Sequence, residues 1–296
     1  MTIAARSQTT LASSAAVTGR GYWSGKKCRV EFRPAPIDSG ITFVRDDLGP
    51  SARIPLHIDA QRSTPRRTVL QAGDAVVEMV EHVAAALAGL GVDNCDVGVN
   101  TAELPGMDGS SVAFVNAIED ARLTRQEAAI NPLVITKPVR CEAGDTWIEA
   151  RPPTHGCLSI EFNLDFGPEA IISPQWMVLD IDSTTFRTDL AVARTFLLKS
   201  EADLIQAQGL ALHVTTSDLL IFDDSTNNAA PLENTLRYPD ECVRHKMLDV
   251  LGDLALAGRP IVGRIVACRS GHQLNGELVR QVLASESGEE ITRRSA

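Results

Sequence analysis

The feature that most constrains the fold is an internal repeat in the order of the expected elements. Each half of the chain contains a helix that carries a histidine, followed by a glycine, a strand, a polar turn and a further helix. His82 precedes Ser110 by 28 residues, and His245 precedes Gln273 by the same 28 residues. Two halves with one order of elements indicate two domains of similar plan. We therefore predict an α+β fold in which each domain is a β-sheet covered by helices on one face.

A polar segment separates the two halves. Residues 122–131 read RLTRQEAAIN and show no strand pattern, so we place the domain boundary there. The prediction is an N-terminal α+β domain over residues 1–125 and a C-terminal α+β domain over residues 130–296. A chain of 296 residues is long enough to give each domain its own core.

Hydrophobic periodicity predicts the main elements of the first half. Apolar residues alternate over residues 28–34, which predicts a strand. Apolar residues at helical spacing predict a helix over residues 74–90. Asp74 is suited to cap the start of this helix, and Gly91 is suited to end it.

The second half shows the same signals. Its main helix is predicted from Pro239 to Ala257, because proline suits the first turn and Gly258 follows the last apolar residue. A closing helix is predicted near residues 274–284. The turn before it reads RSGHQLN and holds His272.

Composition excludes several classes of protein. The 28 basic and 38 acidic residues give a net charge of −10, which disfavours nucleic acid as a partner. No apolar run reaches the ~20 residues that span a bilayer, so no transmembrane segment is expected. The N-terminus lacks the apolar stretch of a secretory signal, and the six cysteines form no CxxC pair. We expect a cytoplasmic protein with reduced cysteines.

The main helix of the second half carries a candidate metal-binding face. His245 and Asp249 are four residues apart, so their side chains lie on one face, and Asp253 follows four residues later. An imidazole and a carboxylate placed in this way can hold one zinc ion. This face is predicted opposite the apolar stripe of the helix, so a solvent-exposed ion pair is the alternative interpretation.

The first half offers a second candidate pair. Glu81 and His82 are adjacent, and a carboxylate beside a metal ligand can take a proton from water. His272 lies in a turn, where proton-transfer groups often occur, although a lone histidine is weak support. The chain has no GxSxG, HExxH, Walker A or Rossmann motif. The residues thus favour a two-domain metal hydrolase with the metal shared between the halves.

Several longer motifs resemble one known family. EHVAAALAGLGVDN, ELPGMDGSSVAFV, ARTF, GLAL, DECVRHKMLDVLGDLALAG and SGHQLN occur in this order between about residues 6 and 283. Together they resemble the zinc-dependent UDP-3-O-acyl-N-acetylglucosamine deacetylase family, which performs the committed step of lipid A biosynthesis. The resemblance implies two α+β domains packed face to face around one zinc ion per chain. It also implies a small β-α-β insert, at about residues 197–222, that forms an apolar passage for the acyl chain.

The resemblance also implies roles for individual residues. It implies that three residues bind zinc: His82, His245 and Asp249. It implies that Glu81 is the general base, that His272 is the general acid paired with Asp253, and that Thr195 donates a hydrogen bond to the oxyanion. It implies that Lys246, Phe196 and Phe166 contact the substrate.

A few positions depart from the family pattern. Tyr22 and Trp23 stand in GRGYWSG where the family has leucine and histidine, His213 and Val214 follow GLAL, and Arg269 replaces a lysine. These departures concern the shape of the acyl passage and the sugar pocket rather than the proposed ligands.

Two adjacent arginines lie outside the family motifs. We expect Arg66 or Arg67, with Lys246 and Arg269, to hold the diphosphate of the substrate, because arginine binds phosphate oxygens in pairs. The alternative is that both arginines form surface ion pairs with acidic residues.

These expectations define one main function and two alternatives. The main function is zinc-dependent hydrolysis of the N-acetyl group of an acylated UDP-N-acetylglucosamine, a small-molecule substrate, by a monomer. A zinc amidase with a shifted substrate and a non-catalytic homologue that binds nucleotide sugars are the alternatives. His57 and His155 have no partner at ligand spacing and are expected to be surface histidines.

Overall fold

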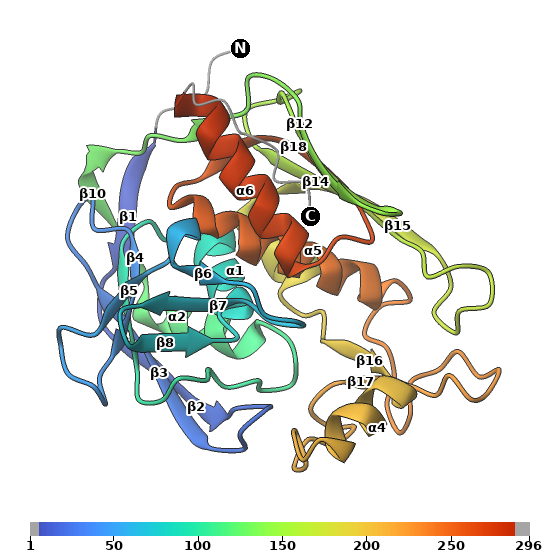
Figure 1. Cartoon of the computed structure of the whole chain (residues 1–296). Helices are drawn as coiled ribbons and strands as arrows, with labels where there is room; N and C mark the ends of the chain where they lie inside the picture. The colour runs from blue at the N-terminus through green and yellow to red at the C-terminus, as the bar shows by residue number, and fades with distance from the viewer. Residues whose placement is uncertain (1–5, 288–296) are drawn as a thin grey trace.

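The computed structural model describes residues 6–287 and contains two larger mixed β-sheets (Figure 1). The first has the strand order β2-β3-β9-β4-β5. Its strands are β2 (Ala15–Arg20), β3 (Lys27–Pro34), β9 (Cys95–Val99), β4 (Ile41–Arg45) and β5 (Arg53–Pro55). Its central strand, β9, is antiparallel to β3 and parallel to β4.

The second sheet repeats this topology. Its order is β12-β13-β18-β14-β15, with the short β11 (Leu133–Val134) paired to β18. Its strands are β12 (Val139–Ala143), β13 (Thr146–Arg151), β18 (Ile261–Cys268), β14 (Leu158–Leu164) and β15 (Gln175–Ile181). In both sheets the last strand in sequence lies at the centre, antiparallel to one neighbour and parallel to the other. The predicted α+β fold with two domains of similar plan is therefore confirmed.

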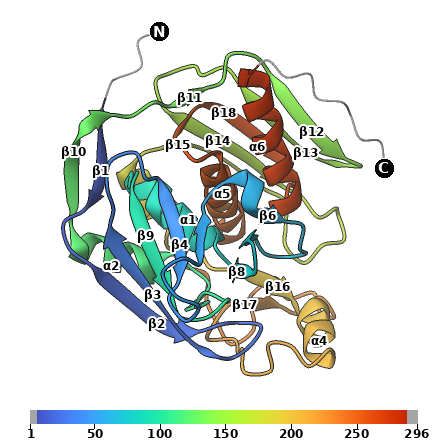
Figure 2. The ribbon, with the colours of Figure 1, turned by 60° about the vertical axis from the view of Figure 1, so that its left-hand side comes forward.

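The helices follow the same repeat. In the first half α1 (Glu81–Leu90) precedes the central strand and α2 (Val112–Ala121) follows it. In the second half α5 (Glu241–Leu254) and α6 (His272–Ser287) take these places. Helices α1 and α5 pack against each other in the middle of the molecule, between the two sheets (Figures 1 and 2).

One glycine allows this close helix contact. A Cβ atom added to Gly252 in α5 would lie 2.2 Å from the backbone oxygen of Glu81 in α1. Atoms cannot approach so closely, so any side chain at this position would force the helices apart. The contact places the first turn of α1 beside the last turn of α5.

Both central helices are buried on nearly every face, which differs from the amphipathic pattern expected. In α1 only Ala88 is exposed among its ten residues, and in α5 only Arg244 and Lys246 are not buried. A helix packed between two domains has no solvent face, so the faces that carry His82 and His245 are also buried. The alternative of a solvent-exposed ion pair is therefore wrong.

The expected start of the first helix needs correction. Residues 75–78 form strand β8 rather than the start of the first helix, and α1 begins at Glu81 without the predicted cap at Asp74. β8 instead joins β6 (Gln61–Arg62) and β7 (Val69–Ala72) in a small sheet, where strand pairing outweighs the helical spacing of the sequence. Gly91 does end α1, with the left-handed φ of 74° that glycine tolerates.

The polar segment at 122–131 is not free of regular structure. It contains β10 (Leu123–Ala129), which pairs with β1 (Ser7–Leu11) in an antiparallel ribbon. Most of its side chains are exposed, which explains why hydrophobic alternation did not reveal it. Backbone hydrogen bonds to β1 hold this strand in place.

The second half carries a further small unit. β16 (Phe196–Leu198), α4 (Lys199–Ala207) and β17 (Leu220–Phe222) lie in the segment expected to form the insert, and the two strands pair in parallel. In Figure 1 this unit projects away from both sheets. Shorter helical turns are α3 (Ser183–Thr185), η1 (Ile58–Ala60), η2 (Phe186–Leu190) and η3 (Ala255–Ala257). Within residues 6–287, no helix has both the length and the apolar composition needed to cross a membrane.

Candidate metal centre and active site

The three predicted metal ligands converge where α1 meets α5. The Nε2 atoms of His82 and His245 lie 3.8 Å and 3.4 Å from Oδ1 of Asp249. One ligand atom from each residue lies within 4.8 Å of the other two, and all three side chains are buried. The rings of the two histidines stand nearly perpendicular, with 5.2 Å between their centroids. The packing of α1 on α5 therefore joins His82 to the pair that is already adjacent on α5.

The neighbours of His245 prepare it to bind a cation. Its Nδ1–H donates to the backbone oxygen of Ala193 at 3.2 Å, so Nε2 is left facing Asp249. Burial lowers the pKa of His245 to about 4, which keeps the imidazole neutral at physiological pH. A neutral imidazole oriented by a carbonyl is the form that binds metal ions.

Asp249 is held as a carboxylate. Burial alone would raise its pKa, but Lys246 and the two histidines lower it well below its usual range. The ammonium of Lys246 donates to Oδ2 of Asp249 at 2.9 Å, which leaves Oδ1 facing the imidazoles. Two neutral nitrogen donors and one carboxylate oxygen suit a zinc-type cation, with a further position free for water or substrate. The residues present therefore fit the metal that the sequence implies.

Glu81 is buried in the first turn of α1, directly before His82. Its Oε2 accepts a hydrogen bond from the backbone N–H of Thr68 at 3.0 Å. Burial raises the pKa of Glu81, although the charges of His272 and His82 oppose the shift. A carboxylate whose pKa is raised toward neutrality can accept a proton from water more readily.

His272 and Asp253 form a hydrogen-bonded pair. The Nδ1–H of His272 donates to Oδ2 of Asp253 at 2.8 Å, and Asp253 is completely buried. Burial alone would lower the pKa of His272, but the charge and hydrogen bond of Asp253 raise it to about 10. The imidazole is therefore protonated at physiological pH. His272 is the first residue of α6, which corrects the expectation that it lies in a turn before the helix.

Sequence reasoning missed two residues that hold Asp253. The hydroxyl of Thr68 donates to Oδ1 at 2.6 Å, and the side-chain amide of Asn275 donates to Oδ2 at 2.9 Å. Because Thr68 also binds Glu81, it links the two acidic residues of the site. Arg66 and Arg67 draw attention to this segment of the sequence, but no local pattern indicates the contact between Thr68 and Asp253.

The segment 193–196 lies next to α5. Ala193 accepts the hydrogen bond of His245, and the ring of Phe196 lies 6.1 Å from the imidazole of His245. Between them, Thr195 donates its hydroxyl to the backbone oxygen of Gly109 at 3.1 Å. Thr195 thus lies directly before Phe196 and two residues after Ala193, and both of these residues contact the candidate ligand His245.

An aromatic cluster extends from Phe196 away from the histidines. Its ring is 6.4 Å from that of Phe166 and 6.5 Å from that of Phe222, which ends β17. Phe166 is 52% exposed, so the cluster opens to solvent at that end. An apolar surface of this kind suits a hydrocarbon chain.

The predicted cations do not form one cluster. Arg66 and Arg67 line a pocket of about 540 Å³ together with His272. Their guanidinium groups are paired with acids, Arg66 with Glu201 at 2.9 Å and Arg67 with Glu78 at 2.8 Å. The pocket is consistent with phosphate binding by these arginines, and the ion pairs are consistent with the alternative of pairing with acidic residues.

The other two cations lie elsewhere. Lys246 is bound to Asp249, and Arg269 lies 3.5 Å from Asp165. Neither belongs to the residues that line the pocket around His272. The expectation of one site formed by all four cations does not match this arrangement.

Three of the residues that depart from the family pattern, Tyr22, Trp23 and His213, connect the same two segments of the chain. The hydroxyl of Tyr22 donates to the backbone oxygen of Asp218, and His213 binds the backbone oxygen of Gly21 at 2.9 Å. The backbone N–H of Ala211 also points to the oxygen of Trp23 at 3.4 Å. The loop before β3 and the segment between α4 and β17 are therefore joined directly.

The remaining surface histidines differ from each other. His57 caps a short helical turn and lies 3.2 Å from Asp59. His155 instead forms a cluster with Cys157 and Asp180, whose possible ligand atoms all lie within 4.8 Å of one another. The expectation that His155 lacks a partner is therefore wrong.

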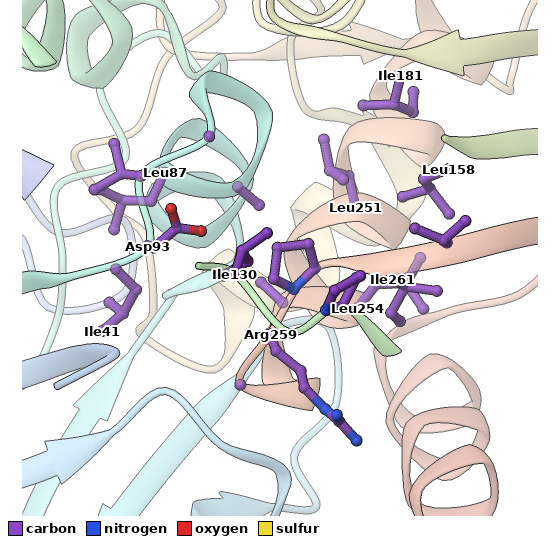
Figure 3. A pocket seen from close by; sticks show the side chains of 18 of the residues that line it. Ile41, Leu87, Asp93, Ile130, Leu158, Ile181, Leu251, Leu254, Arg259 and Ile261 are labelled. Carbon is purple, nitrogen blue, oxygen red and sulfur yellow. The ribbon is translucent and has the colours of Figure 1, made fainter. Parts of the chain in front are cut away.

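A separate cavity lies near the C-terminal ends of α1 and α5. It measures about 400 Å³ and is lined mainly by apolar side chains, among them Leu87, Leu251 and Leu254 (Figure 3). Among the described residues that line it, none is a predicted site residue. The metal-binding group and this cavity are therefore distinct features of the domain contact.

A buried group of two imidazoles and a carboxylate, beside a second carboxylate and a histidine–aspartate pair, is typical of mononuclear metal hydrolases. Comparison with known proteins gives the family. A sequence model of the family described as UDP-3-O-acyl N-acetylglycosamine deacetylase matches residues 8–284. The chain belongs to this family.

Individual relatives agree with this assignment. The UDP-3-O-acyl-N-acetylglucosamine deacetylase of Shewanella halifaxensis is 40% identical over 286 residues, covering 96% of this chain and 92% of the relative. The enzymes of the same name from Shewanella piezotolerans and Shewanella baltica are 39% and 37% identical over the same shares of each chain.

Proposed function

We propose that this chain hydrolyses the N-acetyl group of UDP-3-O-acyl-N-acetylglucosamine to acetate and the free amine, in a zinc-dependent reaction of lipid A biosynthesis. One observation carries the proposal: His82, His245 and Asp249 converge beside Glu81 and the His272–Asp253 pair. Membership of the deacetylase family supplies the substrate class.

We assign the metal to His82, His245 and Asp249. Zinc bound there would polarise the acetamide carbonyl and lower the pKa of water. The carbonyl of Ala193 and the ammonium of Lys246 orient two of these ligands, which supports a preorganised site.

The protein side chains carry the proton transfers in this proposal. Glu81 takes a proton from the attacking water, and its raised pKa suits it to this task. His272, protonated because of Asp253, gives a proton to the leaving amine nitrogen as the C–N bond breaks. Thr195 donates a hydrogen bond to the developing oxyanion. One water molecule is consumed, and acetate and the amine are released.

The remaining contacts concern the rest of the substrate. We propose that Lys246, Phe166 and Phe196 contact the sugar and the acyl chain. Phe222, which packs against Phe196, extends the apolar surface for that chain. Arg66 and Arg67 would bind the diphosphate from the pocket that contains His272, by exchanging their present carboxylate partners for phosphate.

Three further expectations belong to the same proposal. Residues 1–125 and 130–296 would be the two domains, with the insert at about 197–222. The protein would act as a monomer in the cytoplasm. Light scattering of the purified chain across a range of concentrations would measure its mass, and a concentration-dependent dimer would contradict the monomer.

The decisive experiment measures zinc content and deacetylation together. The purified chain should contain one zinc ion and release acetate from UDP-3-O-acyl-N-acetylglucosamine. A chelator should abolish the reaction, and one equivalent of zinc should restore it. A chain that binds the UDP-sugar but never releases acetate would be a non-catalytic homologue. Turnover only of a different amide would establish a shifted substrate.

A further inference from the structure

A second group of potential metal ligands lies outside the proposed active site. It consists of His155, Cys157 and Asp180, which lie at one end of the β14–β15 hairpin. Nε2 of His155 is 3.2 Å from Oδ1 of Asp180. One possible ligand atom from each residue lies within 4.8 Å of the others.

The strand register brings the segment before β14 close to Asp180. Ser159 of β14 pairs with Asp180 of β15, and Leu158 pairs with Ile181. Figure 3 labels Leu158 and Ile181 at the wall of the apolar cavity. His155 and Cys157 lie in the bend that leads into β14, and Cys157 also lines this cavity. The bend therefore places both side chains near Asp180.

The surroundings suit an exchangeable cation. His155 and Asp180 are exposed, and Cys157 is half-buried, so an ion can reach the group from solvent. The hydroxyl of Thr154 lies 3.0 Å from Nδ1 of His155, whereas Nε2 is the ring nitrogen that faces Asp180. A hydrogen bond at the far nitrogen is how proteins orient histidine ligands.

We propose that His155, Cys157 and Asp180 form a second metal site, for a zinc-class divalent cation. An imidazole, a thiolate and a carboxylate form a mixed set of donors that zinc and cobalt accept and that magnesium and calcium disfavour. Three protein ligands leave a position for water, which fits the open face of the hairpin.

Binding at this site releases a proton. Burial and the charges of Asp180 and Asp182 raise the pKa of the Cys157 thiol, so the metal-free cysteine is protonated. The cation replaces this proton, which passes to solvent, and the thiolate then coordinates the cation. No oxidation or reduction takes place.

The experiment uses cobalt as the probe, because a cobalt–thiolate bond has a charge-transfer absorption that nitrogen and oxygen ligands do not give. The group formed by His82, His245 and Asp249 contains no cysteine, so this absorption reports on the second site alone. Titration of the full chain with Co²⁺, after a chelator has removed its bound zinc, should produce the absorption and saturate at two ions per chain. Cys157→Ser should abolish the absorption and leave one bound ion.

Matched variants separate this site from single-cysteine binding. Cys268→Ser, at another half-buried cysteine, should leave the absorption intact. His155→Ala and Asp180→Ala should each weaken cobalt binding at this site by at least about tenfold. His82→Ala should keep the absorption while losing deacetylation, so failure of the proposed function and failure of this site give different results.

Two results would overturn the second site. One is the absence of thiolate absorption in the wild-type titration. The other is an absorption that His155→Ala and Asp180→Ala both leave unchanged, since cysteine alone would then bind the ion. Competition with Zn²⁺, measured as loss of the cobalt signal, should show that zinc binds at least as tightly as cobalt.

Discussion

At the scale of single residues, the buried His245 and the partly buried His272 have different charge states. Burial lowers the pKa of His245 to about 4, whereas the pKa of His272 is raised to about 10. The difference lies in their carboxylate partners. Asp249 is shared between His245 and the cation Lys246, whereas the described residues that hydrogen-bond to Asp253 are Thr68, His272 and Asn275, none of them a lysine or arginine. One imidazole is thereby suited to bind a metal ion and the other to donate a proton.

The proposed metal ligands give the first prediction. Replacing His82, His245 or Asp249 by alanine should lower both zinc content and deacetylation, because a site with three protein ligands loses most of its affinity with one ligand removed. Metal analysis and an acetate-release assay measure the two effects. His57→Ala, outside the site, is the control. Normal zinc content and rate in any one ligand variant would exclude that residue as a ligand.

The proposed base gives the second prediction. Glu81→Gln keeps the size of the side chain but removes its capacity to accept a proton. We expect zinc content to stay unchanged and kcat to fall by roughly 10²–10⁴-fold, as is typical for loss of a general base. Glu142→Gln, at an exposed position on β12, is the matched control. Wild-type turnover in Glu81→Gln would refute the assignment.

The His272–Asp253 pair gives a pH prediction. The proposed mechanism needs protonated His272, so the rate should fall as pH rises through about 10 in the wild-type chain. Asp253→Asn removes the charge that raises this pKa, and burial then lowers it. The alkaline limb of the pH–rate profile should therefore move to lower pH in Asp253→Asn and disappear in His272→Ala. An alkaline limb at the same pH in all three proteins would contradict the pairing.

At the scale of elements, the contact between α1 and α5 brings the ligands together. His82 lies on one helix, and His245 and Asp249 lie on the other. Gly252 allows the backbone of Glu81 to lie against α5, at a distance that no side chain permits. Gly252 thus affects the site by allowing a short distance between the two helices, and it takes no part in binding metal or transferring protons.

This contact gives the fourth prediction. Gly252→Ala should destabilise the chain by about 1–3 kcal/mol, because the added methyl group meets backbone atoms that cannot move independently. It should also weaken zinc binding, since it moves His82 away from Asp249. Urea unfolding and zinc titration measure the two effects. Gly271→Ala, where an added Cβ meets no atom of residues 6–287 within 4 Å, should change stability by less than about 0.5 kcal/mol.

At the scale of the whole molecule, residues of the first half face the insert of the second. Arg66 pairs with Glu201 of α4, and His213 binds the backbone of Gly21. These contacts place the loop before β7 next to the β16–α4–β17 unit, on one side of the pocket that contains His272. A ligand in this pocket would therefore touch elements from both halves of the chain.

The fifth prediction tests the arginines of that pocket. Arg66→Ala combined with Arg67→Ala should raise KM for the UDP-sugar and weaken inhibition by UDP by roughly tenfold or more, because hydrogen bonds between charged groups contribute about 1.5–3 kcal/mol each. Zinc content should not change. Arg53→Ala, an arginine paired on β5, is the control. An unchanged inhibition constant for UDP would leave both arginines as partners of Glu201 and Glu78 only.

Local spacing along the chain was sufficient to predict several features. The separation of four residues between His245 and Asp249 placed them on one helix face, and their atoms do lie 3.4 Å apart. Gly91 and Gly258 marked helix ends, where both adopt left-handed φ angles. The repeated order of elements predicted two domains of one plan. These features depend on neighbouring residues, so the sequence determines them directly.

Only the tertiary structure decided the burial and the partners of the site. No local pattern places α1 against α5, and without that contact His82 would not reach Asp249. Burial on every helix face came from the second domain, and burial together with charged neighbours produced the pKa shifts of His245 and His272. Strand β10 likewise needed β1, more than a hundred residues away in the sequence, as the partner for its backbone hydrogen bonds. Contacts between distant segments depend on how the elements pack, and spacing along the chain carries no record of that packing.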